Sequence, residues 1–164
     1  MSDYVIEWKG LGKAFDKDGA PVEAIQDIDV QIREGEFVSV VGPSGCGKST
    51  LLNMTAGLMQ PTQGEVHYRG SRVTGVNTRV GYVTQKDNLL PWRTVRGNVQ
   101  ISLEIAKVPK AERERRFQEQ IKAVGLVGFE DHLPSELSGG MRKRAVLIRT
   151  FIYEPETLLM DELG

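Results

Sequence analysis

The sequence predicts an α/β protein organised around a strand, a glycine-rich loop and a helix, and three observations indicate this. The uncharged run FVSVV at residues 37–41 is typical of a strand that is covered on both faces in a parallel sheet. The glycine-rich stretch GPSGCGKST at residues 42–50 follows directly, and a helical pattern, STLLNMTAGL, overlaps its end. Strand patterns precede this unit and helical patterns dominate after residue 88.

Length, charge and composition limit the function classes. A chain of 164 residues fits one ordinary domain, which at this size buries roughly 70% of its unfolded surface. With 21 basic and 22 acidic residues there is no overall field, and we expect no nucleic-acid partner. No apolar run approaches a membrane span and no secretory pattern opens the chain, so we expect a soluble, cytoplasmic protein. Cys46 has no disulfide partner, and His67 and His132 lack metal-like spacing.

The first half of the chain reads mainly as strands. Ile28, Val30 and Ile32 alternate with polar residues at the period of a strand, and a turn follows at residues 33–36. After the strand predicted at 37–41 comes the helix, which we expect to end near Gly57. EVHY at 65–68 and RVGYVTQ at 79–85 indicate further strands, separated by Gly70 and Gly75.

The second half reads mainly as helices, and residues 88–135 form a predicted helical subdomain. Thr94 can cap a helix whose inward residues are Val95, Val99, Leu103 and Ala106. A second helix follows within 109–125, with Phe117, Ile121 and Val124 inward. Its charged residues between 112 and 119 could form a binding surface, but a solvated face with paired charges is favoured. A last helix starts around Ser138, buries Met141, Ala145, Ile148 and Ile152, and gives way at Pro155 to the strand TLLM.

The glycine-rich stretch predicts a site for a polyphosphate. It matches the pattern of glycine, four residues, glycine, lysine and then serine or threonine. Glycines allow backbone N–H groups to approach the phosphates, Lys48 supplies a cation, and Ser49 supplies a hydroxyl ligand for Mg²⁺. A chance match would occur in roughly one random chain of this length in a few hundred. The nucleotide-binding candidates are Gly42, Pro43, Ser44, Gly45, Cys46, Gly47, Lys48, Ser49 and Thr50.

A second anion site is predicted at LSGGM, residues 137–141. Ser138 can cap a helix, while Gly139 and Gly140 expose backbone N–H groups at its positive end. Arg142, Lys143 and Arg144 crowd the same end, which is unfavourable unless an anion or an acidic partner lies near. Seen alone, the stretch could equally be an ordinary capped helix.

Together with the phosphate loop, LSGGM resembles the signature sequence of the ATP-binding cassette (ABC) ATPases. The resemblance implies a P-loop NTPase fold: a RecA-like core with an antiparallel β subdomain and a helical subdomain. It implies Mg²⁺ and ATP as ligands, with Asp161 and Gln85 at the metal beside Ser49. It also implies catalytic roles for Glu162, as the general base, and for Gln85 and Lys48. Adenine would stack on Phe15, although a lone Phe is more often a core residue.

The segment QKDNLLPWRTV at 85–95 is similar to that of nitrate, sulfonate and taurine importers. In that branch the region faces a transmembrane permease subunit, so the stretch from Asn88 to Trp92 would be its contact. Without such a partner, Leu89, Leu90 and Trp92 would be exposed, unless the helical subdomain buries them. The resemblance further implies a head-to-tail dimer with a second ATP-binding subunit, an indirect link to a periplasmic or lipoprotein solute-binding protein, and a position on the inner face of the membrane.

The sequence departs from the family pattern at two places. Met141 replaces the usual signature glutamine, and the chain ends two residues after Glu162, so the fold is expected to be incomplete at its C-terminus. The expected parts are 1–87 (β subdomain and phosphate loop), 88–136 (helical subdomain) and 137–164 (signature helix and last strand). In this family the next strand of the chain is inserted between the strand before the phosphate loop and the strand before Asp161. The resemblance therefore implies a sheet that lacks this middle strand, which should impair ATP hydrolysis before ATP binding. A nucleotide-binding remnant without turnover and a non-transport cassette are therefore the alternatives.

Overall fold

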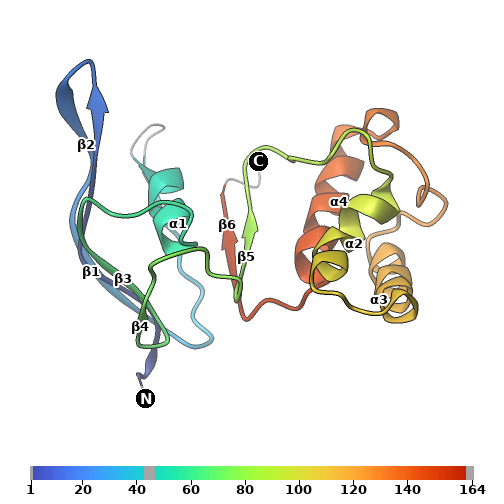
Figure 1. Cartoon of the computed structure of the whole chain (residues 1–164), viewed down its shortest axis with the longest axis horizontal. Helices are drawn as coiled ribbons and strands as arrows, with labels where there is room; N and C mark the ends of the chain where they lie inside the picture. The colour runs from blue at the N-terminus through green and yellow to red at the C-terminus, as the bar shows by residue number, and fades with distance from the viewer. Residues whose placement is uncertain (1, 43–46, 162–164) are drawn as a thin grey trace. The chain divides into compact units, whose positions relative to one another are not determined.

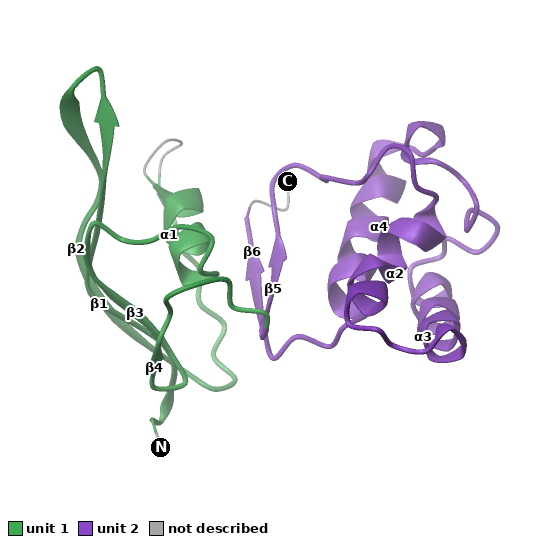
Figure 2. Ribbon diagram, viewed as in Figure 1, with its two compact units in different colours: residues 1–78 green, residues 79–164 purple. Residues whose placement is uncertain are grey.

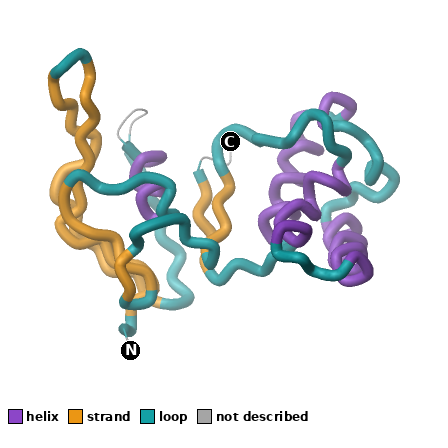
Figure 3. Tube along the Cα trace, viewed as in Figure 1, coloured by secondary structure: helices purple, strands orange, loops and turns teal. Residues whose placement is uncertain are grey.

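The computed structural model describes residues 2–42 and 47–161, which form two compact units, 1–78 and 79–164 (Figure 2). The first unit is mainly strands with one helix, and the second is mainly helices with two short strands (Figure 3). The finer division into 1–87, 88–136 and 137–164 stays a prediction.

The first unit is built on an antiparallel sheet of four strands in the order β2-β1-β3-β4. The strands are β1 (Tyr4–Lys17), β2 (Ala20–Arg33), β3 (Gln63–Tyr68) and β4 (Ser71–Arg72). β1 and β2 form the long hairpin drawn in blue in Figure 1. The strands expected at 28–32 and 65–68 are confirmed as parts of β2 and β3, and each of them pairs with β1.

One helix, α1 (Lys48–Thr55), packs on this sheet. Its residues Leu51, Met54 and Thr55 are buried. Trp8 of β1 donates its indole N–H to the hydroxyl of Thr55, at 3.0 Å. The helix stops before Gly57, which has φ +77° and lies so close to the Gly75 carbonyl that a Cβ would come within 1.9 Å of it. The expected helix end near Gly57 is confirmed.

The prediction of a strand at residues 37–41 is wrong. These residues are assigned no regular structure, and Phe37 and Val41 are 95% and 88% exposed. β-branched, apolar residues favour a strand only when a neighbouring strand satisfies their backbone groups. Within residues 2–42 and 47–161, the four-stranded sheet is complete without this run, so nothing pairs with it.

In its described residues, 79–161, the second unit holds three helices and a parallel strand pair. The strands are β5 (Val80–Val83) and β6 (Thr157–Met160), and the helices are α2 (Val95–Ile105), α3 (Lys110–Ala123) and α4 (Gly139–Phe151), with a short 3₁₀ turn η1 (Pro134–Glu136). The predicted strand TLLM is confirmed. β5 is shorter than the predicted strand 79–85, so Gln85 lies two residues beyond its end.

The helices enclose one apolar core, which includes Val95, Val99, Leu103, Phe117, Ile121, Leu126, Ala145, Ile148 and Ile152. Helical spacing therefore predicted the inward faces correctly, with one exception. Ala106 is exposed because α2 ends at Ile105 and Ala106 forms its C-cap. Met141 and Val124 pack against the core while staying partly exposed.

Candidate functional site: two helix amino termini and a strand edge

The amino end of α1 carries the described part of the phosphate loop. Gly47 precedes the helix with φ +92°, and a Cβ there would lie 2.7 Å from the carbonyl oxygen of Ala24. Only glycine fits this junction. Pro43, Ser44, Gly45 and Cys46 lie outside the described residues, while Gly42 is partly buried and Thr50 belongs to the first turn of α1.

The first turn of α1 is suited to an anion. Among the residues that the structure describes, no side chain caps it, and it contains no acidic residue. The opening N–H groups of a helix need acceptors from elsewhere, and the dipole favours negative charge at this end. Lys48 and exposed Ser49 stand in that turn. A polyphosphate with a hard divalent cation therefore fits the donor set, since it offers acceptors to the amides and charge to the lysine.

Phe15 lies near the end of β1, opposite Val22 of β2. Its ring is 39% exposed, so it is not a core residue. The Lys13 ammonium lies 5.4 Å from the ring centroid. An exposed aromatic face can stack on a base, and the stacking role of Phe15 stays a prediction.

The predicted cap at the signature stretch is confirmed. Ser138 Oγ accepts a hydrogen bond of 3.2 Å from the Met141 amide, and α4 begins at Gly139. Ser138, Gly139 and Gly140 are all exposed, so their backbone is accessible to an anion.

The crowded cations beside this turn have acceptors within the same unit. Arg142 donates to the Leu137 carbonyl at 2.8 Å and forms an ion pair of 3.3 Å with Asp87. Arg144 donates to the Val124 carbonyl at 3.0 Å. The positive charge that the sequence left unexplained is therefore bound locally by carbonyls and one carboxylate.

Gln85 and Asp161 follow two neighbouring strands of the second unit. β5 and β6 are parallel, so their carboxyl ends share one edge. The Asp161 amide donates to the Val83 carbonyl at 2.9 Å, which fixes Asp161 directly after β6. Asp161 is buried, whereas Gln85 is exposed. Burial, with a smaller effect of the Asp161 charge, raises the pKa of Tyr82 on β5 to about 12. Glu162, the predicted catalytic base, lies outside the described residues.

The segment from Asn88 to Trp92 divides into a buried and an exposed part. Leu89 joins the helical core and Leu90 is half-buried, so the expected exposed patch does not include Leu89. Trp92, in contrast, is 73% exposed. The apolar contact surface left for a partner is mainly this indole.

Sequence reasoning missed the residues that hold this segment. Asn98 of α2, buried at 1% exposure, accepts from the Leu90 amide at 2.8 Å and donates to the carbonyls of Leu90, Arg93 and Thr94. Arg149 of α4 donates to the carbonyls of Asp87 and Asn88. Burial lowers the pKa of Arg149. The seven-residue spacing of Arg142 and Arg149, which places both on one helix face, was the available signal.

Lys48, Ser49 and Phe15 belong to the first unit, and Gln85, Asp161 and the signature turn belong to the second. Among residues 2–42 and 47–161, no group of three or more His, Cys, Asp or Glu side chains is arranged to hold a metal. Nor does any helix in those ranges have the length and apolar character needed to cross a bilayer.

The fold and these two helix termini define a P-loop NTPase of the cassette type, and the comparisons with known proteins agree. A family model described as ABC transporter matches residues 25–163. The chain therefore belongs to the ABC transporter family.

Curated relatives include an uncharacterised ABC transporter ATP-binding protein of Methanocaldococcus jannaschii, 47% identical over 96% of this chain and 59% of the relative. A taurine import ATP-binding protein of Yersinia pestis is 44% identical over 85% of this chain and 54% of its own length. The chain thus spans a little over half of these relatives.

Among solved structures, an ATP-binding cassette, described as a dimer in a post-hydrolysis state with ADP and Pi, matches with a TM-score of 0.87. It is 33% identical to this chain, and the match covers 96% of this chain and 73% of that one.

Proposed function

We propose that this chain binds Mg-ATP through residues 42–50 as part of the energising subunit of an ABC importer. The observation that carries the proposal is the junction of Gly47 and α1. A left-handed glycine that no other residue can replace leads into a helix whose first turn lacks a side-chain cap among the described residues. Family membership supports ATP as the ligand, because the matched region includes this loop.

Each predicted site residue has a role in this proposal. Lys48 holds the β and γ phosphates, and backbone amides of the loop surround them. Bound Mg²⁺ would neutralise phosphate charge, with Ser49, Gln85 and Asp161 as its protein ligands. Glu162 accepts a proton from the attacking water. Phe15 stacks on the adenine.

The second anion site takes the nucleotide of a neighbouring copy. We propose a head-to-tail dimer in which the exposed turn at Ser138, Gly139 and Gly140 faces the phosphates held by the partner's loop. The solved cassette that resembles this chain is described as dimeric, which supports the arrangement. Closure and reopening of the dimer would then link ATP turnover to movement of a partner.

Solute import is the favoured process. Relatives named as taurine import ATP-binding proteins support it, as does exposed Trp92 on the segment that we expect to meet a transmembrane permease. A solute-binding protein would act only indirectly, and the subunit would lie peripherally on the inner face of the membrane. Trp92→Ser should weaken pull-down by a transmembrane permease subunit that binds the unaltered chain. Equal pull-down of both forms would contradict the role of Trp92, and failure of the unaltered chain to bind any permease would favour a non-transport cassette.

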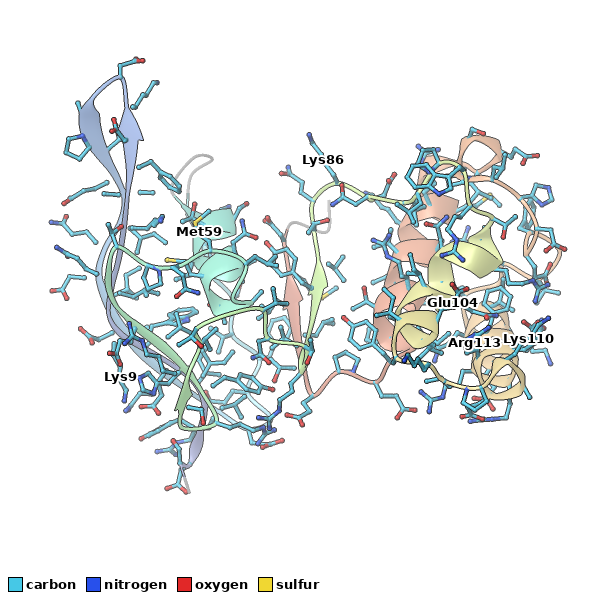
Figure 4. All side chains as sticks on the ribbon, viewed as in Figure 1. Lys9, Met59, Lys86, Glu104, Lys110 and Arg113 are labelled. Atoms are coloured by element: carbon cyan, nitrogen blue, oxygen red, sulfur yellow. The ribbon has the colours of Figure 1, made fainter. Side chains whose placement is uncertain are left out.

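The loop assignment is tested with a fluorescent ATP analogue. Lys48→Ala removes charge-assisted bonds and should weaken binding roughly 10- to 100-fold. Lys9→Ala is the matched control, since Lys9 lies on the sheet of the same unit (Figure 4), is exposed, and contacts Glu7. Equal affinity of the two variants would contradict the proposal.

Nucleotide binding without turnover is the second candidate, and residues 37–41 favour it. This run leads directly into the phosphate loop, yet it is exposed and forms no ladder with the described strands. A loop whose preceding strand is not held can bind phosphate but positions reacting groups poorly, and a misplacement of about 1 Å can lower a rate 100-fold. This candidate would be selected if the wild-type chain binds ATP but releases phosphate no faster than Lys48→Ala does.

A further inference from the structure

One arginine of the signature helix holds the backbone that follows Gln85. Arg149 donates through Nη1 to the Asn88 carbonyl at 3.0 Å and through Nη2 to the Asp87 carbonyl at 2.8 Å. One guanidinium thus bridges two consecutive carbonyls. The planar fork of arginine suits this geometry, whereas a lysine ammonium would reach the carbonyls without the fixed pair of parallel donors.

A second arginine of the same helix holds the side chain of the same segment. Arg142 pairs with Asp87 Oδ2 at 3.3 Å, and Asp87 Oδ1 accepts from the Leu89 amide at 3.1 Å. Arg142 also donates to the carbonyl of Leu137, the residue before Ser138. It therefore connects the segment after β5 with the signature turn itself.

The segment is also closed on itself around Gln85. The Thr84 hydroxyl donates to the Lys86 carbonyl at 2.5 Å, and Asn88 Nδ2 donates to the same hydroxyl oxygen at 3.0 Å. Asn88 adopts φ +52°, a left-handed conformation that asparagine tolerates better than most residues. Gln85 therefore lies inside a short closed turn whose far end, at Asp87 and Asn88, is fixed to α4.

We propose that Arg149, assisted by Arg142, is a positioning residue that fixes the Gln85 turn on the signature helix. The inference deepens the proposed function and rests on it, because it assigns to this contact the placement of a Mg²⁺ ligand. It also means that the Gln85 turn and the Ser138 turn move together. Asn98 binds the next part of the segment to α2, through the amide and the carbonyl of Leu90.

The contact itself is tested by hydrogen exchange on the whole chain without nucleotide. Arg149→Met should speed exchange of the amides at residues 84–90 roughly 10- to 100-fold. Arg149→Lys should give a smaller increase. Arg113→Met is the matched control, because Arg113 of α3 likewise donates to a carbonyl, that of Val108, but not to this segment (Figure 4). Unchanged protection at 84–90 in Arg149→Met would overturn the proposal.

A milder variant guards against loss of folding. Arg142→Gln removes the ion pair with Asp87 at a partly exposed position and should speed exchange at the same amides by roughly 3- to 10-fold. If Arg149→Met does not fold, this variant decides: protection equal to that of the wild-type chain would overturn the proposal.

The positioning role is tested by the Mg²⁺ dependence of ATP affinity, measured with the ion and with a chelator. Gln85→Ala and Arg149→Met should both reduce the tightening of ATP binding by Mg²⁺, and Arg149→Lys should restore part of it. Loss in Gln85→Ala but full retention in Arg149→Met would overturn the positioning role. If the wild-type chain and Lys48→Ala bind ATP equally, the proposed function is wrong. The hydrogen-exchange experiment would still show whether Arg149 holds residues 84–90.

Discussion

The indole N–H of Trp8 donates to the hydroxyl oxygen of Thr55 at 3.0 Å, which joins the first strand to the last residue of α1. Thr55 in turn donates to the Leu51 carbonyl at 2.8 Å, one turn earlier in the helix. Both groups are buried, so neither has water as an alternative partner. The direction of α1, and with it the place of Lys48 at its opposite end, depends on this buried pair.

Thr55→Val should destabilise the first unit by about 1 to 3 kcal/mol, because the buried indole N–H loses its acceptor while the shape is kept. Chemical denaturation monitored by circular dichroism measures the loss. Trp8→Phe in the Thr55→Val background provides the control, since the double variant should lose less than the sum of the two single losses. Strict additivity would show that the bond contributes nothing.

Gly47→Ala should weaken nucleotide binding because of a steric clash, in addition to the strain of its left-handed backbone. A Cβ at Gly47 meets the Ala24 carbonyl at 2.7 Å, so the junction must shift. Gly19→Ala is the matched control: Gly19 also has positive φ, +80°, but a Cβ there meets nothing within 4 Å. Both variants should cost about 1 to 2 kcal/mol for the left-handed backbone, and only Gly47→Ala should lower ATP affinity. Equal affinities would show that the junction is not part of the site.

Ser138→Ala and Thr94→Ala remove equivalent helix caps. Ser138 accepts from the Met141 amide at 3.2 Å, and Thr94 accepts from the Gly97 amide at 3.1 Å. Each variant should lose about 0.5 to 2 kcal/mol of stability. Only Ser138→Ala should also weaken ATP-dependent dimerisation, measured by sedimentation. An identical effect of both variants on dimerisation would reduce Ser138 to an ordinary cap.

Asn98→Ala should loosen the segment that carries Trp92. The side chain of Asn98 satisfies the Leu90 amide and three carbonyls, and none of these contacts can be made by alanine. A loss of about 1 to 3 kcal/mol is expected for each buried group left unpaired. Faster quenching of Trp92 fluorescence in a Trp8→Phe background reports the loosening. Unchanged quenching and stability would contradict this role.

The free energy of unfolding of the second unit should fall at low pH as Glu114 becomes protonated. Hydrogen bonds from Arg96, and then from Gln118, lower the pKa of Glu114 from 4.5 to about 2. A lowered pKa stabilises the fold above the unfolded value, so this contribution is full above pH 4.5 and is lost as the pH falls toward 2. Glu114 is partly exposed, so the effect is about 0.2 to 1 kcal/mol. Glu114→Gln should flatten that part of the pH dependence of unfolding, and an identical pH dependence would be contrary evidence.

The elements that the sequence predicts well are those with strong local signals. The Thr94 and Ser138 caps and the inward faces of α2, α3 and α4 are confirmed, because capping and helical periodicity act within a few residues. The alternation at residues 28–32 also predicted a strand correctly, since these residues belong to β2. The site positions at Lys48 and Ser138 could likewise be located, since both belong to short contiguous motifs.

What the sequence could not predict depends on distant partners. The run at 37–41 has the composition of a strand, but composition does not say whether a neighbour is present to pair with it. Asn98 and Arg149 read as ordinary polar positions on two helices. Their roles come from backbone carbonyls eight and about sixty residues away in the sequence. The seven-residue spacing of Arg142 and Arg149 indicates a shared helix face, but it does not indicate which carbonyls that face contacts.

The exposed run at 37–41 has a consequence for handling the protein. Five consecutive uncharged residues, rich in valine and without proline, are exposed and belong to neither sheet of the described residues. Such a stretch can form β-sheet pairing with another molecule of the protein, so the purified protein should self-associate at high concentration. Val38→Lys would place a charge in this stretch and should reduce aggregation, which light scattering would measure.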